Sequence, residues 1–239
     1  MGPGDRVLEI GAGFGSLTVA LVGAGCRVLA IETDRRLVSA LKEVVATSPH
    51  VRVKQVDAMR TDWRALLDPG NGWATVSNLP YNISVPLILD LLDHVPAIDR
   101  YLVMVQQEVG ERLVAAAGDA AYGAVSIHVA YRADATLVRR VPAAVFWPRP
   151  KVGSVLVRLV PHASSVGTDP SALFRVVEEG FAERRKTMAN ALRRLGLDAE
   201  TAGDVMRVSG FDARTRAEAL RLEDLARITE AALERGWSP

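Results

Sequence analysis

The stretch RVLEIGAGFGSLT, residues 6–18, decides the fold. Its opening segment RVLEI (6–10) is mostly branched and apolar, which predicts a buried strand of a parallel sheet. The turn after this strand holds three glycines, which are Gly11, Gly13 and Gly15. Glycines there let the backbone turn tightly before a predicted helix over residues 16–25 and approach a ligand closely. The turn alone is weak evidence for any ligand, and Ser16 stands where the dinucleotide fingerprint G-x-G-x-x-G requires its third glycine.

Apolar runs typical of strands alternate with stretches of helical periodicity along the rest of the first half of the chain. Further strands are predicted over residues 27–32, 51–57, 73–79 and 100–106. Further helices are predicted over residues 34–46, 84–95 and 107–117. This alternation predicts a parallel sheet that is covered by helices on both faces. Residues 136–141 and 154–160 flank a proline-rich loop and are predicted to close the sheet as an antiparallel pair.

The chain has two parts that differ in their predicted secondary structure. Its 239 residues are enough for one full core and a small second unit. After a polar stretch at residues 161–170 the strand pattern stops, and only helical patterns follow. We therefore expect a sheet domain over residues 1–162 and an all-helical domain over residues 163–239.

Charge and composition narrow the class of protein. The formal net charge is +1, so no global field attracts nucleic acid, and a polyanion would have to meet a local basic patch. The single cysteine, Cys26, cannot form an intramolecular disulfide and is expected to be a buried apolar residue, which fits a reducing cytoplasm. No apolar run reaches the length of a membrane span and no signal peptide precedes the first strand, so we expect a cytoplasmic protein without membrane contact.

Groups that can bind a nucleoside follow the second and third predicted strands. Glu32 ends the second strand, where a carboxylate can accept hydrogen bonds from both hydroxyls of a ribose. Asp57 ends the third, where it can accept from an adenine amino group while the N–H of Ala58 reaches a ring nitrogen. The alternatives are a solvated strand end for Glu32 and a helix N-cap for Asp57. Because ligands bind at the carboxyl edge of parallel sheets, this set predicts a site for S-adenosylmethionine, which has no pyrophosphate to hold.

The fourth predicted strand ends in NLPYNIS, residues 78–84. The exocyclic amine of a base is a poor nucleophile, because its lone pair is delocalised into the ring. The side-chain oxygen of Asn78 and a backbone carbonyl can accept its N–H groups, which reduces this delocalisation and stabilises the developing positive charge. Pro80 removes a competing donor, and Tyr81 offers a face on which a flipped base can stack. The alternative is an ordinary Asn-x-Pro turn.

Four stretches together closely resemble the rRNA adenine N6,N6-dimethyltransferase family. They are EIGAGFGSLT (9–18), NLPYNIS (78–84), VFWPRPKVGSVLVRL (145–159) and FAERRKTMANAL (181–192). Glutamine and DNA-adenine methyltransferases share an N/D-P-P-Y loop, but not NLPYNIS followed by F-x-P-x-P-K-V. The resemblance covers about residues 7–227. It implies an α/β fold with a Rossmann-like class I sheet that binds S-adenosyl-L-methionine, and a small C-terminal helical domain that binds RNA.

The family has two branches, and the helical tail with RRKT and ALRLEDLARI resembles the small-subunit branch. That branch dimethylates two adjacent adenines in a hairpin near the 3′ end of 16S rRNA, which implies the pre-30S ribosomal particle as partner. The alternative branch dimethylates one adenine of 23S rRNA and confers macrolide resistance. An alternative of another class is a non-catalytic RNA-binding assembly or transcription factor with the same fold.

Carried over position by position, the resemblance implies which residues act. Cofactor contacts are implied for Gly11, Glu32, Asp57 and Asn78, with Gly13, Gly15 and Ala58 in the same turns. The residues implied around the target amine are Asn78, Leu79 (through its backbone), Pro80 and Tyr81. Phe146 is implied to pack on the other face of the flipped base. The alternative is that Phe146 and Trp147 are core residues under the proline-rich loop.

Basic residues gather locally in the later part of the chain. The expected RNA contacts come from Arg149, Lys151, Arg184, Arg185 and Lys186. Such contacts position an RNA by its phosphates without reading its sequence. The alternatives are that these side chains are simply solvated or that part of the RRKT segment braces the junction between domains. No metal is expected, and a monomer is the default expectation.

The sequence departs from the family pattern in two places. Members carry a Gln-Asn-Phe-Leu-like segment before the first strand, whose residues close over the cofactor, and nothing here matches it. We therefore expect that part of the site to be missing and the cofactor affinity of an N-terminally truncated chain to be weakened. Members usually have an acidic or polar residue after P-K-V, whereas this chain has Gly153, which a strand-entry turn tolerates.

Overall fold

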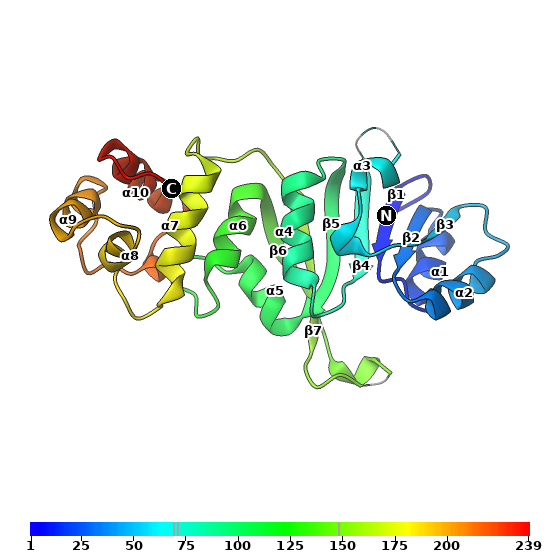
Figure 1. Ribbon diagram of the computed structural model, residues 1–239. Coiled ribbons are helices and arrows are strands. Elements are labelled where there is room, and N and C mark those ends of the chain that lie inside the picture. The colour runs from blue at the N-terminus through cyan, green and yellow to red at the C-terminus, as the bar shows by residue number, and fades with distance from the viewer. Residues whose placement is uncertain (69, 71, 148) are drawn as a thin grey trace. The chain divides into compact units, whose positions relative to one another are not determined.

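The computed structural model describes residues 1–68, 70, 72–147 and 149–239. The described residues form two compact units. The first comprises Met1–Glu111 and Ala133–Pro161 and holds the sheet, whereas the second comprises Arg112–Arg132 and His162–Pro239 and is helical (Figure 1). No helix in the described part of the chain is long and apolar enough to cross a membrane.

The first unit is built on a seven-stranded sheet in the order β3-β2-β1-β4-β5-β7-β6. The strands are β1 (Arg6–Ile10), β2 (Arg27–Glu32), β3 (Val51–Gln55), β4 (Trp73–Asn78), β5 (Ile98–Gln106), β6 (Ala133–Val141) and β7 (Ser154–Pro161). β1 to β5 are parallel, and β7 runs antiparallel to both of its neighbours. This confirms the predicted α/β fold with an antiparallel closing pair. The order reverses between β1 and β4, and in open parallel sheets ligands bind at the carboxyl ends of the strands beside such a reversal.

The strands at the centre are buried on both faces. In β1 and β2, consecutive residues are buried rather than alternate ones, as expected where helices cover both sides of a parallel sheet. The covering helices are α1 (Ser16–Gly23), α2 (Arg35–Val44), α3 (Trp63–Leu66), α4 (Ser84–His94) and α5 (Gln107–Val114), with 3₁₀ turns η1 (Ala58–Arg60) and η2 (Ala143–Val145). α2 begins after Asp34, whose carboxylate accepts the N–H of Arg36 at 2.8 Å.

The second unit packs its helices around a separate apolar core. Its elements are α6 (Ala124–Arg132), α7 (Pro170–Ala182), α8 (Met188–Arg194), α9 (Ala199–Val208), η3 (Ala217–Ala219) and α10 (Leu222–Glu234). Residues 112–132 belong to this unit, whereas the sequence placed them in a first domain that continues to residue 162. The physical reason is that Ile127 and Tyr131 of α6 bury their side chains in the same cluster as Leu173 and Leu192.

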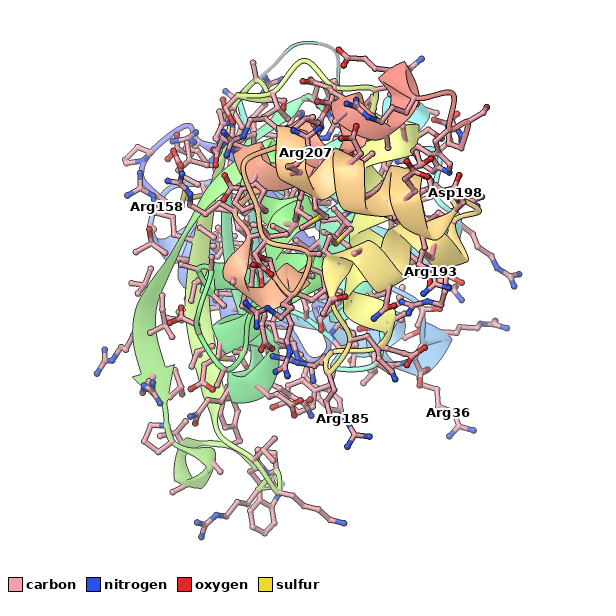
Figure 2. All side chains as sticks on the ribbon, turned by 90° about the vertical axis from the view of Figure 1, so that its left-hand side faces the viewer. Arg36, Arg158, Arg185, Arg193, Asp198 and Arg207 are labelled. Carbon is pink, nitrogen blue, oxygen red and sulfur yellow. The ribbon has the colours of Figure 1, made fainter. Side chains whose placement is uncertain are left out.

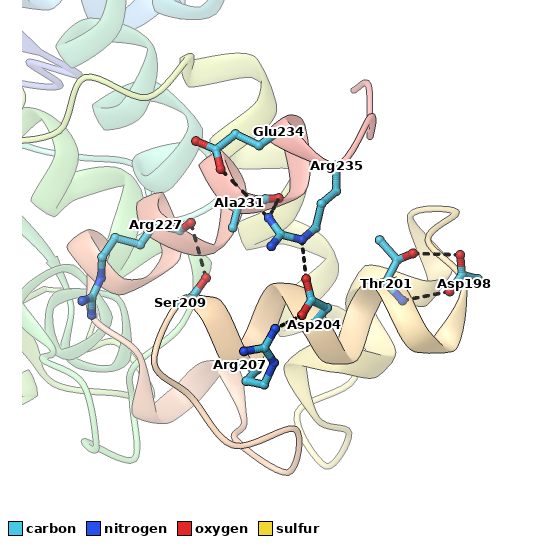
Figure 3. A network of polar contacts seen from close by, with 9 residues as sticks. All are labelled: Asp198, Thr201, Asp204, Arg207, Ser209, Arg227, Ala231, Glu234 and Arg235. Atoms are coloured by element: carbon cyan, nitrogen blue, oxygen red, sulfur yellow. Dashed lines mark hydrogen bonds and ion pairs between the residues drawn. The ribbon is translucent and has the colours of Figure 1, made fainter.

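A polar network joins α9 to α10 within the helical unit (Figure 3). Asp204 accepts hydrogen bonds from Arg207 and from Nε of Arg235, the latter at 2.8 Å. The hydrogen bond from Arg235, followed by the one from Arg207, lowers the pKa of the Asp204 carboxyl. The hydroxyl of Ser209 donates to the carbonyl of Arg227 at 3.5 Å. These polar contacts link the two helices in addition to their apolar packing.

Candidate active site at the carboxyl ends of the strands

The glycine-rich turn after β1 lies directly against the NLPY turn after β4. Gly11 has φ 73°, a left-handed conformation that residues with a Cβ rarely adopt. A Cβ on Gly11 would lie 3.3 Å from Cδ of Pro80. Gly13 has φ 57°, and a Cβ there would meet nothing within 4 Å. The backbone therefore packs closely on the Pro80 side and leaves open space beside Gly13.

Glu32 at the end of β2 is built into this turn. Its side chain is largely buried, and Oε2 accepts the N–H of Gly13 at 3.0 Å. Oε1 accepts the N–H groups of Thr33 at 2.7 Å and of Asp34 at 3.0 Å. A solvated strand end is thus the wrong description of Glu32. A carboxylate has about four acceptor positions, so one remains for a ligand hydroxyl.

Asp57 follows β3 and is exposed. Its Oδ1 accepts the N–H of Met59 at 2.9 Å and so caps η1, which was the alternative interpretation of this residue. Its Oδ2 lies 3.8 Å from Nε of Arg60. Ala58 is buried at the start of η1. The cap leaves the second carboxylate oxygen of Asp57 facing only this long ion pair, so binding of an adenine amino group stays a prediction.

The NLPY turn is anchored by its backbone, while its first side chain is free. The N–H of Leu79 donates to the carbonyl of Met104 on β5 at 3.1 Å, and the Leu79 side chain is buried. The N–H of Ile83 donates to the carbonyl of Pro80 at 3.2 Å. The side chain of Asn78 is exposed and forms no hydrogen bond with any residue that the structure describes. Its amide is therefore available to a ligand.

Tyr81 is tied to the edge of the sheet by a residue that the sequence did not single out. The hydroxyls of Tyr81 and Ser154 are 3.0 Å apart, and either can be the donor. Ser154 is the first residue of β7 and pairs with Gln106, the last residue of β5. The two hydroxyls are 73 positions apart in sequence, so no local pattern connects them.

The proline-rich connection between β6 and β7 meets the NLPY turn. We call residues 142–153 the arm, of which Pro148, part of the F-x-P-x-P-K-V motif, lies outside the described residues. The arm extends past the ends of the strands (Figure 1). A pocket of about 310 Å³ is lined by Asn78, Leu79, Pro80, Tyr81, Phe146, Trp147 and Pro150. The structure thus brings the predicted Phe146 to the predicted NLPY turn. It adds Trp147 and Pro150, to which the sequence assigned no functional role.

The alternative that the arm's aromatic residues form a core is wrong for Trp147. This side chain is 97% exposed. Phe146 is partly buried and lines the pocket. Val145, two residues earlier in the arm, is exposed as well.

The expected RNA-binding residues fall into two groups. Arg149 and Lys151 of the arm are exposed, and neither forms an ion pair with a described residue. Arg184 braces the helical unit instead, because it donates to the carbonyl of Ala120 at 3.1 Å and lies 3.7 Å from the Glu218 carboxylate.

Arg185 and Lys186 are exposed and have no ion-pair partner among the residues described. Figure 2 shows Arg185 and Arg193 extending from the ribbon of the helical unit. Of the RRK segment, Arg185 and Lys186 are therefore the residues whose charges are available to an external anion.

A buried carboxyl group lies under the glycine-rich turn. Glu9 of β1 is only 2% exposed and accepts the hydroxyl hydrogen of Thr18 at an oxygen–oxygen distance of 2.6 Å. Burial raises the pKa of Glu9 from its ordinary value of 4.5 to about 7, although the hydrogen bonds from Thr18 act in the opposite direction. Glu9 could not be recognised from the sequence, because an acidic residue inside RVLEI looks like an interruption of an apolar strand.

Replacing Glu9 with glutamine is expected to flatten the pH dependence of stability. Between pH 4.5 and 7 the unfolded chain loses the Glu9 proton while the folded chain keeps it, so the free energy of unfolding falls as the pH rises. The total loss is about 3 kcal/mol, from a rise in pKa of about 2.5 units. Urea unfolding of both proteins at pH 4 and pH 8 measures it. The variant should gain stability relative to wild type at pH 8, and parallel curves would contradict this assignment.

The opposite edge of the sheet holds a different cavity. It measures about 330 Å³ and is lined by Arg6, Arg27, Val28, Leu29, Pro49, His50, Arg52, Asp68 and Trp73. Arg6, Arg27 and Trp73 start β1, β2 and β4, so this cavity lies at the amino ends of the strands. None of the predicted cofactor or target residues lines it. The candidate active site is therefore the carboxyl edge.

The fold and the site together define the class of protein. A Rossmann-like class I methyltransferase has this sheet order, with an antiparallel seventh strand. It also has the glycine-rich first turn and the row of acceptor groups at the carboxyl edge. The sequence model of the family described as ribosomal RNA adenine dimethylase matches residues 1–233. The chain belongs to this family.

Relatives and solved structures agree with that membership. The protein named ribosomal RNA small subunit methyltransferase A from Pseudomonas aeruginosa is 43% identical over 194 residues, which cover 80% of this chain and 72% of that protein. The protein of the same name from Cutibacterium acnes is 41% identical over 249 residues, covering 99% and 82%.

Among solved structures, a dimethyladenosine transferase from Plasmodium falciparum is similar with a TM-score of 0.82 and 27% identity, covering 99% of this chain and 93% of that one. The 23S rRNA methyltransferase ErmE is similar with a TM-score of 0.72, covering 97% and 92%. At its 23% identity the likeness to ErmE concerns the fold alone.

Proposed function

We propose that this protein transfers methyl groups from S-adenosylmethionine to N6 of two adjacent adenines in small-subunit rRNA, giving N6,N6-dimethyladenosine. The observation that carries the proposal is the pocket in which the free Asn78 amide meets the aromatic residues Tyr81 and Phe146, beside the glycine-rich turn. Similarity to relatives named small subunit methyltransferase A supports the choice of subunit. The alternative, methylation of large-subunit rRNA, is supported only by the similarity of the fold to that of ErmE.

The residues at the carboxyl edge fit S-adenosylmethionine. Open space lies beside Gly13, where a Cβ would meet nothing, so a ligand can approach the backbone. The remaining acceptor position of Glu32 suits a ribose hydroxyl, and Asp57 with the N–H of Ala58 suits the adenine edge. When bound, the cofactor supplies an electrophilic methyl group on a sulfonium. The proposed role of the chain is then to present the target amine to it.

Activation of the target amine rests on the NLPY turn. Oδ1 of Asn78 and the carbonyl of Leu79 accept the two N–H groups of the amine, which stabilises positive charge as it develops on nitrogen. Pro80 has no N–H to compete for these acceptors. Tyr81 and Phe146 enclose the two faces of the flipped base, and the Ser154 hydroxyl holds the Tyr81 ring in place. With the cofactor bound, methyl transfer to the amine nitrogen would break the C–S bond and leave a neutral thioether, and the nitrogen would lose its extra proton to water.

The RNA is held by its phosphates. Arg149 and Lys151 on the arm, with Arg185 and Lys186 on the helical unit, supply cations that no described carboxylate neutralises. The partner is small-subunit rRNA in the pre-30S particle, and the protein acts as a monomer in the cytoplasm without a metal ion. Target choice depends on the shape of the RNA around an unpaired adenine rather than on reading a duplex sequence.

Labelled S-adenosylmethionine and purified unmethylated ribosomal subunits test the proposal. We expect label in the small subunit only, recovered as N6,N6-dimethyladenosine after digestion to nucleosides, and none in small subunits that already carry the modification. Label in the large subunit would move the protein to the other branch. Cofactor binding and RNA binding without transfer would indicate a non-catalytic assembly factor and end the proposal.

A further inference from the structure

We propose that Trp147 forms a second base-binding subsite, a stacking platform for the nucleobase next to the target adenine. The inference rests on the proposed function, because it assumes that the target base enters the pocket beside Tyr81 and Phe146. Its ligand is an unpaired purine of the RNA, bound by its ring face rather than by its hydrogen-bonding edge.

The exposure of Trp147 sets it apart from the other tryptophans of the chain. Trp63, Trp73 and Trp237 are 6%, 2% and 8% exposed, whereas Trp147 is 97% exposed. An aromatic side chain of this size buries roughly 150–250 Å² when it is packed. An unpacked indole therefore lacks the large favourable free energy of burying that surface. No described residue packs over most of the Trp147 ring, and an external flat group would supply such a contact.

The geometry of the arm aims Phe146 and Trp147 at different bases. The backbone at Phe146 is extended, with φ −102° and ψ 149°. Successive side chains of an extended segment point to opposite sides. Phe146 is accordingly half-buried and Trp147 fully exposed, although both line the same pocket. One ring can therefore cover the target base while the other receives a neighbouring base at the pocket mouth.

The surroundings of Trp147 favour a nucleic acid over an apolar protein surface. None of the described residues that line the pocket is acidic. Arg149 and Lys151 follow within four residues, and both charges are exposed and unpaired among described residues. A base on the indole would place its own phosphates near these cations, as in grooves that bind single strands through stacking and charge together. The substrate offers such a base, because the two target adenines are adjacent.

Intrinsic fluorescence tests this subsite directly, because the three other tryptophans are buried. The probe is an RNA hairpin with two adjacent loop adenines. The matched control is the same hairpin with an abasic site in place of the second adenine. We expect the first hairpin to quench the emission of wild type, and neither hairpin to do so in Trp147→Phe. We expect Trp147→Ala to bind the first hairpin about 10-fold more weakly, and Trp147→Phe to stay within about 3-fold of wild type.

The abasic hairpin separates stacking from other effects of the substitution. Wild type should bind the abasic hairpin about 10-fold more weakly than the first hairpin. Trp147→Ala should bind the two hairpins with equal affinity, because the ring and the base form one interaction, which this variant has already lost. Val145→Ala, which removes another exposed apolar side chain of the arm, should bind both hairpins as wild type does.

Three results would each overturn the subsite. They are unchanged affinity of Trp147→Ala, additive losses with the abasic hairpin, and quenching that needs ribosomal proteins rather than the hairpin. Binding and quenching are read without any methyl transfer, so failure of the subsite is distinguishable from failure of the proposed function. If wild type transfers no methyl group yet the hairpin quenches Trp147, the subsite stands and the proposed function falls.

Discussion

Replacement of Asn78 by alanine is expected to lower methyl transfer by about 100- to 1,000-fold, the range seen when one preorganised polar group is removed from a transition state. The amide oxygen of Asn78 is a side-chain carbonyl that the NLPY turn presents to the pocket. Without it, the target amine keeps its lone pair in the ring, and the positive charge on nitrogen develops unsupported. The loss should appear in kcat, because the amide acts more strongly on the charged transition state than on the neutral amine.

The fold should survive this change. The Asn78 side chain is exposed and bonds to no described residue, so its removal should alter the free energy of unfolding by no more than about 0.5 kcal/mol. The matched control is Asn82→Ala, because Asn82 is an exposed asparagine of the same turn that does not line the pocket. Single-turnover transfer to unmethylated small subunits, together with thermal unfolding, measures both effects. Equal activity of Asn78→Ala and Asn82→Ala would remove Asn78 from the mechanism.

Most of the sheet could be predicted because its pattern is local. A strand buried on both faces is a short apolar run, and RVLEI and RVLAIE are such runs next to glycines or turns. The carboxyl edge followed from the same reasoning, since parallel strands end on one side. This located Glu32 and Asn78 near one another without knowledge of any contact between them.

Helix α6 was not among the predicted elements, because its sequence is ambiguous. AVSIHVAYR contains several β-branched residues and no helical cap signal. It is helical because Ile127 and Tyr131 fill the core of the second unit, and packing overrides propensity there. The same helix explains why the boundary between the two units was misplaced for residues 112–132.

The finer features of the site depend on contacts between distant segments. The hydrogen bond between Tyr81 and Ser154 joins the NLPY turn to the start of β7, which only the assembled sheet brings together. The arm sequence contains two adjacent aromatic residues, and nothing local says that Phe146 is half-buried while Trp147 is exposed. Asp57 illustrates the reverse case, since its cap on η1 is a local motif that the sequence did anticipate as an alternative.

Replacement of Glu32 by glutamine is expected to weaken S-adenosylmethionine binding by about 100-fold. The two carboxylate oxygens accept three backbone N–H groups, from Gly13, Thr33 and Asp34. A carboxamide has one oxygen, and its NH₂ group must face a donor whichever way it turns. These donors are only partly buried, but a hydrogen bond to a charged group contributes about 1.5–3 kcal/mol, and both the turn and the ribose hydroxyl lose part of that contribution. Together these losses correspond to about 100-fold in affinity.

Isothermal titration with S-adenosylmethionine measures this effect, and a matched variant identifies its cause. Asp34→Asn lies two residues away and keeps an N-cap acceptor for Arg36, so its cofactor affinity should stay within about 2-fold of wild type. Glu32→Asp keeps the charge but shortens the reach, so an intermediate loss is expected even if Glu32→Gln folds poorly. Since Gly13 is linked to β2 through Glu32, both Glu32 variants should also increase hydrogen exchange at the Gly13 amide. Wild-type affinity in Glu32→Gln would mean that the carboxylate only braces the turn, and that the ribose is held by other groups.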